Sequence, residues 1–501
     1  MRSSGILMHI TSLPGPYGIG TMGREAYRFV DFLKAAGQSY WQILPLTPTG
    51  FGDSPYQSCS TFAGNPYLID LDALAEEGLL KREALASHDW GAQPERVDFG
   101  RLYIHRWQVL REAYAAFPGS EEFDCFCRRA SSWLPDFALF MALKKEYGGA
   151  WYTWPEALKR REPDAVWHAR QSLRDEIRFQ SFVQFAFFHQ WEALRGYAHR
   201  SGVRIIGDVP IYVPYDSVEV WASPELFRLD AQLAPEAVAG CPPDAFTEDG
   251  QLWGNPLYRW DTLRKDGYGW WIRRLAAAGE LYDVVRFDHF RGFESFWAVP
   301  YGDETARGGA WEPGPGLEFI RAVQRALPGL KLIAEDLGYL TPEVLRLRDE
   351  SSLPGMKVLE FAFDSREPSD YLPHNYTRNS VCYTGTHDNM TMRQWFDTAS
   401  PDAAAYAREY LALTEQEGLV WGCIRSAMAS VSDLAVIQMQ DYLDLGGEAR
   451  MNFPGTTGSN WGWRAADGYL DASLARRIRS LTTLYGRLGD QAEKKEINTH
   501  E

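Results

Sequence analysis

The sequence reads VVRFDHFRG at 284–292, LIAEDLG at 332–338 and YTGTHDN at 383–389, and each stretch places acids directly after a short apolar run. Asp288, Glu335 and Asp388 are 47 and 53 residues apart, about the length of one strand–helix unit with its loops. In a parallel β/α barrel, catalytic residues come from the C-terminal ends of several strands and meet on one face. The spacing therefore predicts converging carboxylates, an arrangement suited to glycosidic bond chemistry.

Eight short apolar runs support this architecture, because strands buried on both faces of a parallel sheet read as continuous apolar segments. The runs are 5–10, 40–44, 203–208, 283–288, 332–336, 358–363, 381–384 and 434–438. Amphipathic segments such as 26–36 and 318–326 lie between several of them. We therefore expect an α/β fold, a (β/α)8 TIM barrel. The alternative is an open doubly wound sheet, but no G-x-G-x-x-G follows the first run.

Uneven spacing between the runs predicts insertions after barrel strands. The expected parts are the barrel start (1–69), a mainly helical inserted subdomain (70–195), the remainder of the catalytic barrel (196–488) with loop-rich insertions at 214–260 and 300–316, and a polar tail (489–501). Each insertion follows a strand, so each should overhang the active face. Long loops in compact enzymes are usually lids or binding loops.

Composition narrows the classes of partner. The net charge of −16 argues against nucleic acid and against an anionic membrane surface. Nineteen Trp and 25 Tyr provide flat apolar faces with polar edges that suit sugar rings, although most of them should fill the core. No apolar stretch reaches the length needed to cross a bilayer. Six dispersed cysteines and no secretory signal predict free thiols and a cytoplasmic location.

The first motif can supply a nucleophile. Side chains two apart on a strand face the same side, so Arg286 should point with Asp288. A neighbouring guanidinium favours the ionised carboxylate, which is the form that attacks an anomeric carbon. Taken alone, the pair is better interpreted as a structural salt bridge at a strand end.

The second motif can supply a general acid. Glu335 and Asp336 are adjacent and diverge on a strand, so only one of them can point straight into a pocket. The apolar run before them places that carboxyl at a dry rim, where desolvation and like charges raise its pKa. The alternative is a capping acid for the next helix, and Asp336 fits that role better than Glu335.

The third motif can bind hydroxyls and stabilise positive charge. His387 can donate to sugar hydroxyls, and Asp388 can stabilise an oxocarbenium-like centre. A metal site is the rival interpretation, but no H-x-H or H-E-x-x-H spacing appears. Asp208 at the end of run 203–208 adds a fourth acid. Four strand ends that carry acids favour one shared site over separate accidents.

The chain resembles the 4-α-glucanotransferase family (amylomaltase, or disproportionating enzyme) of the wider α-amylase clan over most of its length. The motifs that carry the resemblance are SSGILMHITSLPGPYGIG, GDSPYQSCSTFAGNPYLIDL, GDVPIYV, LWGNPLYRW, RFDHFRGFE, AEDLG, LPGMKVLEFAF, YTGTHDN and RMNFPGTTGSNWGWR. Runs of this length are highly specific.

The resemblance implies a retaining enzyme on α-1,4-glucans and maltooligosaccharides, with glucose or a short glucan as acceptor and no cofactor or metal. It makes Asp288 the nucleophile, Glu335 the general acid/base and Asp388 the transition-state stabiliser. The positions it implies for substrate binding or its support are Arg286, His387, Asp208, Tyr56, Ser54, Trp253, Asp336 and Asn460. Trp253 lies in the insertion that covers the donor sugar in this family.

Three other functions remain as alternatives. The nearest is an α-1,4-glucan hydrolase of the amylase type with the same three carboxylates. Amylases typically carry an Asn-His pair four residues after the acid of their first motif, whereas Val-Pro-Ile-Tyr follows Asp208 here. The more distant alternatives are a metal-dependent sugar isomerase on a β/α barrel and a catalytically silent glucan-binding protein.

Overall fold

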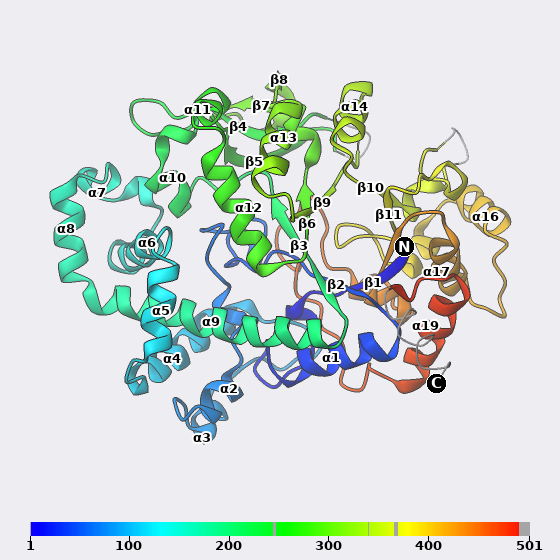
Figure 1. Cartoon of the computed structure of the whole chain (residues 1–501), viewed down its shortest axis with the longest axis horizontal. Coiled ribbons are helices and arrows are strands. Elements are labelled where there is room, and N and C mark those ends of the chain that lie inside the picture. The colour runs from blue at the N-terminus through cyan, green and yellow to red at the C-terminus, as the bar shows by residue number, and fades with distance from the viewer. Residues whose placement is uncertain (1, 244–246, 339, 365–368, 490–501) are drawn as a thin grey trace.

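The computed structural model describes residues 2–243, 247–338, 340–364 and 369–489 and contains a closed barrel of eight parallel strands (Figure 1). The strands are β1 (Ser3–Leu7), β2 (Tyr40–Gln42), β3 (Arg204–Pro210), β6 (Val284–Asp288), β9 (Lys331–Ala334), β10 (Gly355–Val358), β11 (Ser380–Tyr383) and β12 (Leu434–Gln438). The barrel closes where β1 pairs with both β12 and β2. The predicted TIM barrel is confirmed.

Strand register aligns the C-terminal ends that carry the acids. Asp208 of β3 lies opposite Arg286 of β6, and Phe287 lies opposite Ala334 of β9. Because the strands are parallel, the residues that follow them leave the barrel at one edge. Asp288, Glu335 and the loop after β11 therefore emerge together.

Helices that follow the strands cover the barrel. The helices are α1 (Arg24–Ala35), α12 (Gly269–Leu281), α13 (Gly316–Ala326), α14 (Pro342–Ser351), α15 (Met392–Thr398), α16 (Pro401–Tyr410), α17 (Leu419–Ala429), α18 (Met439–Tyr442) and α19 (Ala472–Leu484). In α1 the buried residues Ala26, Phe29, Val30 and Leu33 follow helical spacing. α14 begins with Pro342 behind the Thr341 cap, whose hydroxyl accepts from the Val344 N–H.

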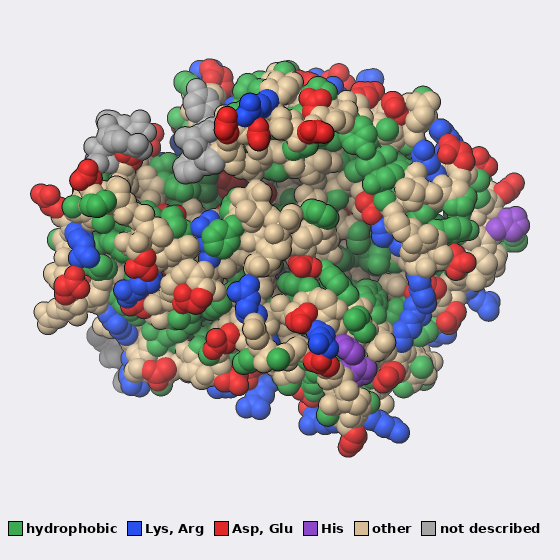
Figure 2. All heavy atoms as spheres, turned by 180° about the vertical axis from the view of Figure 1, so that it is seen from behind, with side chains coloured by type: hydrophobic (Ala, Val, Ile, Leu, Met, Phe, Trp, Pro, Cys, Tyr) green, Lys and Arg blue, Asp and Glu red, His purple; other side chains and the backbone are tan. Residues whose placement is uncertain are grey.

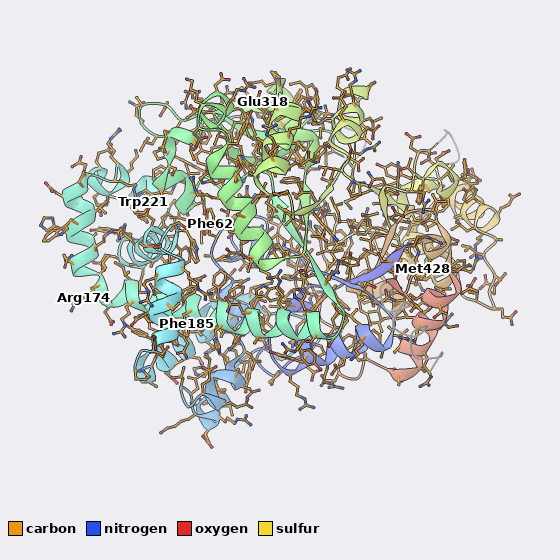
Figure 3. The ribbon with its side chains drawn as sticks, in the orientation of Figure 1. Phe62, Arg174, Phe185, Trp221, Glu318 and Met428 are labelled. Atoms are coloured by element: carbon orange, nitrogen blue, oxygen red, sulfur yellow. The ribbon has the colours of Figure 1, made fainter. Side chains whose placement is uncertain are left out.

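Helices fill most of the chain between β2 and β3. The helices are α2 (Leu71–Glu76), α3 (Arg82–Leu85), α4 (Phe99–Ala116), α5 (Glu121–Arg129), α6 (Leu134–Tyr147), α7 (Glu156–Lys159), α8 (Pro163–Ser172) and α9 (Arg174–Arg200). Phe185 of α9, labelled in Figure 3, meets Phe123 of α5 with ring centroids 5.6 Å apart. Trp221 of α10 (Val218–Ala222), which follows β3, packs edge-on against Trp154. α9 leads back to β3, and α11 (Trp260–Lys265) precedes α12. The division of the chain into an inserted subdomain stays an interpretation.

The two later insertions and the segment before the second of them form a sheet that the sequence did not predict. β4 (Ala237–Cys241), β5 (Gln251–Pro256), β7 (Ser295–Pro300) and β8 (Ala310–Pro313) form an antiparallel sheet in the order β5-β4-β7-β8. Its central pair joins Val238 to Val299, residues far apart in the chain. Pairing over that distance leaves no local signal, and the surrounding Gly and Pro residues read as loop.

Two predicted strands have different bounds in the structure. The run 358–363 overlaps its strand only at Val358, because β10 begins at Gly355 and residues Leu359–Ala362 form a 3-10 helix. Lys357 interrupts the apolar pattern there, and Gly355 is required because a Cβ would lie 2.4 Å from Asp336 Oδ2. The run 5–10 is also displaced, since β1 ends at Leu7 and Ile10 starts a 3-10 helix.

The surface carries mixed charge. On the face shown in Figure 2, Lys and Arg side chains are interspersed with Asp and Glu and form no large basic patch. The search for a helix long and apolar enough to cross a membrane, made over the described residues, found none. Cys59, Cys125, Cys127, Cys382 and Cys423 are free thiols. Most of the predicted polar tail, residues 490–501, lies outside the described residues.

Candidate active site

A cavity of about 630 Å³ lies at the C-terminal ends of the barrel strands. The structure brings most of the predicted site residues to its wall, namely Ser54, Tyr56, Trp253, Arg286, Asp288, Glu335, His387, Asp388 and Asn460. Asp208 and Asp336 are the two that do not line it. The three predicted catalytic carboxylates therefore share one pocket.

Arg286 organises the charges beneath the cavity. One of its terminal nitrogens lies 2.6 Å from Asp208 Oδ2 and 2.9 Å from Asp288 Oδ1. Burial lowers the pKa of Arg286, but the charges of Asp208, Asp288 and Glu335 outweigh burial and raise it well above its usual value. A permanent cation thus holds the Asp288 carboxylate in place while leaving it partly open to the cavity.

Glu335 is the carboxyl best suited to hold a proton. Burial is the largest influence on it and raises its pKa to about 8, with Asp288 adding to the rise and Arg286 opposing it. The backbone N–H of His289 donates to Oε2 over 2.7 Å, and the N–H of Leu337 donates to Oε1 over 3.1 Å. These two bonds fix the direction of the carboxyl group. A proton on Glu335 near neutral pH suits general acid catalysis.

The pKa of Asp388 is shifted in the direction opposite to that of Glu335. Burial alone would raise its pKa, but His387, Asn452 and Arg286 outweigh it and hold the pKa below the usual range. Asn452 Nδ2 donates to Asp388 Oδ1 over 2.6 Å, and His387 Nε2 lies 3.3 Å from Oδ2. This carboxylate stays negative and can stabilise a positive centre in the cavity.

Asp208 supports the site from below. It is 2% exposed, and its Oδ2 accepts from Arg286 and from the Tyr56 hydroxyl at 2.8 Å. Burial is the main cause that raises its pKa to about 6. These two bonds show that Asp208 orients the side chains of Arg286 and Tyr56.

Asp336 ties neighbouring elements together. Arg348 of α14 donates to its Oδ2 over 2.7 Å, and the Met356 N–H of β10 donates to Oδ1 over 2.6 Å. Of the two roles that the resemblance allows for Asp336, the structure favours the structural one: it holds α14 and β10 beside the site and does not line the cavity. The alternative interpretation, in which Asp336 caps the following helix, is wrong, because Thr341 caps α14.

Aromatic rings shape the cavity. Tyr56 stacks on His387 with centroids 5.1 Å apart, and Trp461 lies 5.9 Å from the same imidazole. Trp253 meets His289 edge-on at 4.8 Å. Such faces suit the apolar surfaces of sugar rings.

Two polar residues of the implied set hold the loops that line the cavity. The Ser54 hydroxyl accepts from the Tyr56 N–H over 3.2 Å. The side chain of Asn460 accepts from the Phe453 N–H at 3.0 Å and donates to the Thr456 carbonyl at 3.1 Å. Both therefore order their own loop as well as face the cavity.

Asn452 and His289 were not identified from the sequence. Asn452 lies in RMNFPGTTGSNWGWR, but its pairing with Asp388 spans 64 residues and appears only in the fold. His289 has φ of 53°, a left-handed conformation that aims its N–H at Glu335. Strain of this kind concentrates at functional sites. Sequence gives no signal for it.

The insertions contribute unequally to the cavity. Residues 214–260 supply part of the wall, including Gln251, Leu252, Trp253 and Asn255. None of residues 300–316 and none of residues 70–195, all of which the structure describes, line it. All three insertions were expected to overhang the active face. Of the three, only the 214–260 insertion lines the cavity.

A closed parallel barrel that gathers three carboxylates of differing electrostatic character in an aromatic-walled cavity defines a class: barrel enzymes that cleave or transfer glycosidic bonds. No group of three or more His, Cys, Asp or Glu among the described residues could hold a metal ion.

Comparisons with known proteins specify the family. The model of the family described as 4-alpha-glucanotransferase matches residues 8–470. The 4-alpha-glucanotransferase of Thermus thermophilus is 50% identical over 501 residues, covering 97% of this chain and 99% of that protein. The one from Clostridium butyricum is 47% identical over 485 residues, covering 96% and 100%.

A solved structure agrees with these relatives. The amylomaltase from Streptococcus agalactiae in complex with acarbose superposes with a TM-score of 0.95 at 44% identity, covering 97% of this chain and 100% of that one. The chain belongs to the 4-alpha-glucanotransferase family.

Proposed function

We propose that this enzyme transfers segments of α-1,4-glucan between maltooligosaccharides by a retaining double displacement. The observation that carries the proposal is the arrangement around Arg286. This cation contacts Asp288, while the nearby Glu335 has a pKa raised to about 8 by burial. The site thus offers a charged nucleophile and a protonated acid at one cavity, the pair that retaining chemistry requires.

The first step cleaves a glycosidic bond of the donor glucan. Asp288 attacks the anomeric carbon as the bond from that carbon to the leaving-group oxygen breaks, and Glu335 gives its proton to that oxygen. The shortened glucan leaves with a new 4-hydroxyl, and the retained segment is held as an ester on Asp288. Asp388 stabilises the positive charge that develops on the sugar ring between these states.

The second step builds the product. Glu335, now a carboxylate, takes the proton from the 4-hydroxyl of glucose or of a short glucan. The acceptor oxygen attacks the anomeric carbon, and the bond to Asp288 breaks. This step restores Asp288 as a carboxylate and Glu335 as an acid, so protons and bonds balance over the cycle.

Transfer competes with hydrolysis because water can take the acceptor's place. A covered intermediate and a well-bound acceptor favour transfer. Residues of the 214–260 insertion that line the cavity, above all Trp253 against His289, support such a cover. An amylase-type hydrolase is the second candidate.

Incubation of the purified enzyme with maltotriose alone separates the two candidates. Chain lengths are followed by chromatography, and reducing ends are counted in parallel. A ladder above three units together with glucose, with little gain in reducing ends, is the expected result. Maltose and glucose alone, with rising reducing ends, would make the protein a hydrolase.

A further inference from the structure

The Asp388–Asn452 pair joins two loops from different strands. Asp388 follows β11 and Asn452 follows β12, and the 2.6 Å hydrogen bond between their side chains crosses from one loop to the other. Both residues line the cavity. The bond exists only while the two loops keep their relative position, so whatever holds the loops together also sets the direction of the Asp388 carboxylate.

Arg450 links the backbones of these two loops. Its Nε donates to the Asn452 carbonyl over 2.8 Å, and a terminal nitrogen donates to the Asp388 carbonyl over 2.9 Å. The guanidinium also lies over the Phe453 ring, 4.1 Å from its centroid. Arg450 is absent from the cavity lining. It therefore acts on substrate only through the residues that it holds.

A buried acid lies behind this arginine. Glu360 is 9% exposed, and its Oε2 is a buried oxygen with no hydrogen-bond partner. Burial raises its pKa to about 8; Arg450 and a hydrogen bond from the Met390 N–H oppose the rise, and the charge of Asp441 adds to it. Arg450 is therefore the cation that opposes the effect of burial on this carboxyl.

Other hydrogen bonds hold the rest of the loop that follows β11. Asp441 is fully buried and accepts from the Thr384 hydroxyl at 2.5 Å and the Met392 N–H at 2.8 Å. The Asn389 side chain accepts from the Thr386 N–H and hydroxyl inside the loop. These bonds fix the loop's ends and interior, but none joins it to Asn452. Gln438 and Asp441 thus also tie the β11 loop to the end of β12 and to α18 after it, but Arg450 is the side chain that contacts the backbones of Asp388 and Asn452 themselves.

We propose that Arg450 is a positioning residue that keeps Asp388 and Asn452 paired for glycosyl transfer. The inference rests on the proposed function, since it concerns the proposed transition-state stabiliser. A planar guanidinium can serve two carbonyls at once in fixed directions, which a single flexible ammonium does not reproduce. Small displacements of a catalytic group lower the rate more than they weaken binding.

The first test replaces Arg450 in the full-length enzyme. Arg450→Met should lower kcat on maltotriose by about 10- to 100-fold, with KM within about threefold, because the arginine holds a transition-state group and does not line the cavity. Arg450→Lys should recover part of the loss. The matched control is Arg393→Met, which removes an exposed arginine paired with Asp444 and should leave kcat unchanged.

A double-mutant cycle supplies a readout that a general loss of stability would not mimic. Asn452→Ala removes the bond to Asp388 directly. If Arg450 acts by maintaining that bond, Arg450→Met combined with Asn452→Ala should be little slower than the slower single variant. Losses in kcat that multiply, or a fall in activity of Arg450→Met that is recovered in full by assaying well below its melting temperature, would overturn the proposal.

The rates are also measured with α-maltosyl fluoride, by fluoride release. This substrate reports glycosyl-enzyme formation whether the acceptor is glucan or water. If the maltotriose products show that the wild type only hydrolyses, the proposed transfer is contradicted, while fluoride release from the Arg450 variants still tests the positioning of Asp388.

Discussion

At the scale of single residues, Asp288 is the group whose loss should be most severe. Asp288→Asn keeps the shape of the side chain but removes the nucleophile, so we expect turnover to fall at least about 1,000-fold. Steady-state transfer on maltotriose measures the loss, and thermal unfolding checks the fold. Asp261→Asn, which alters a largely exposed aspartate, is the control. Retained activity in Asp288→Asn would remove it as nucleophile.

Glu335 should determine the alkaline limb of the pH profile. Burial, aided by Asp288, raises its pKa to about 8, and an acid must be protonated to work. Because the raised pKa keeps the proton on at neutral pH, kcat/KM should hold below about 8 and fall as pH rises through that value. Fluoride leaves a glycosyl fluoride without help from an acid. With that substrate, the rate of the glycosylation step should therefore show no alkaline limb. A limb that persists there would point to another group, such as Glu360.

Sequence predicted the acids at this scale better than their partners. Asp288 and Glu335 stand at or directly after the ends of apolar runs, and Asp388 follows one after a Thr-Gly-Thr turn, so strand ends and chemistry coincide in the chain. Asn452 and the left-handed His289 contribute through contacts with distant residues, and no local pattern encodes those contacts. The resemblance placed Asp336 among the substrate-binding or supporting positions, and its bonds to α14 and β10 give it a supporting place.

At the scale of elements, the strand β5 should influence the fate of the glycosyl-enzyme. Trp253→Ala opens the cavity wall beside His289, so water should compete better and the ratio of transfer to hydrolysis should fall several-fold. Reducing-end release set against the chromatographic ladder measures this ratio. Trp311→Ala, on β8 of the same sheet but away from the cavity, is the control. An unchanged ratio in Trp253→Ala would mean that this element does not exclude water.

Barrel strands were predictable because burial on both faces selects apolar runs, and 434–438 coincides with β12. The rule fails for β10, where Gly355 is kept for space beside Asp336 and Lys357 breaks the run. It also misses β4, β5, β7 and β8, because this antiparallel sheet depends on pairing between segments that are distant in the chain.

At the scale of the whole molecule, catalysis should need no metal ion. The carboxylates are satisfied by Arg286, Asn452 and backbone N–H groups, which supply the stabilisation that a cation would otherwise give. Treatment with EDTA followed by gel filtration should leave the rate on maltotriose unchanged. Strong inhibition that added divalent ions reverse would revive the metal-dependent alternative.

The central claim is that the barrel brings Asp288 to the anomeric carbon as the nucleophile of a double displacement. Mass spectrometry of Glu335→Gln mixed with α-maltosyl fluoride tests it most directly, because fluoride leaves without an acid while the missing base slows release. We expect a glycosyl adduct that peptide mapping places on Asp288. Fluoride release without any adduct, or an adduct on another residue, would contradict the account.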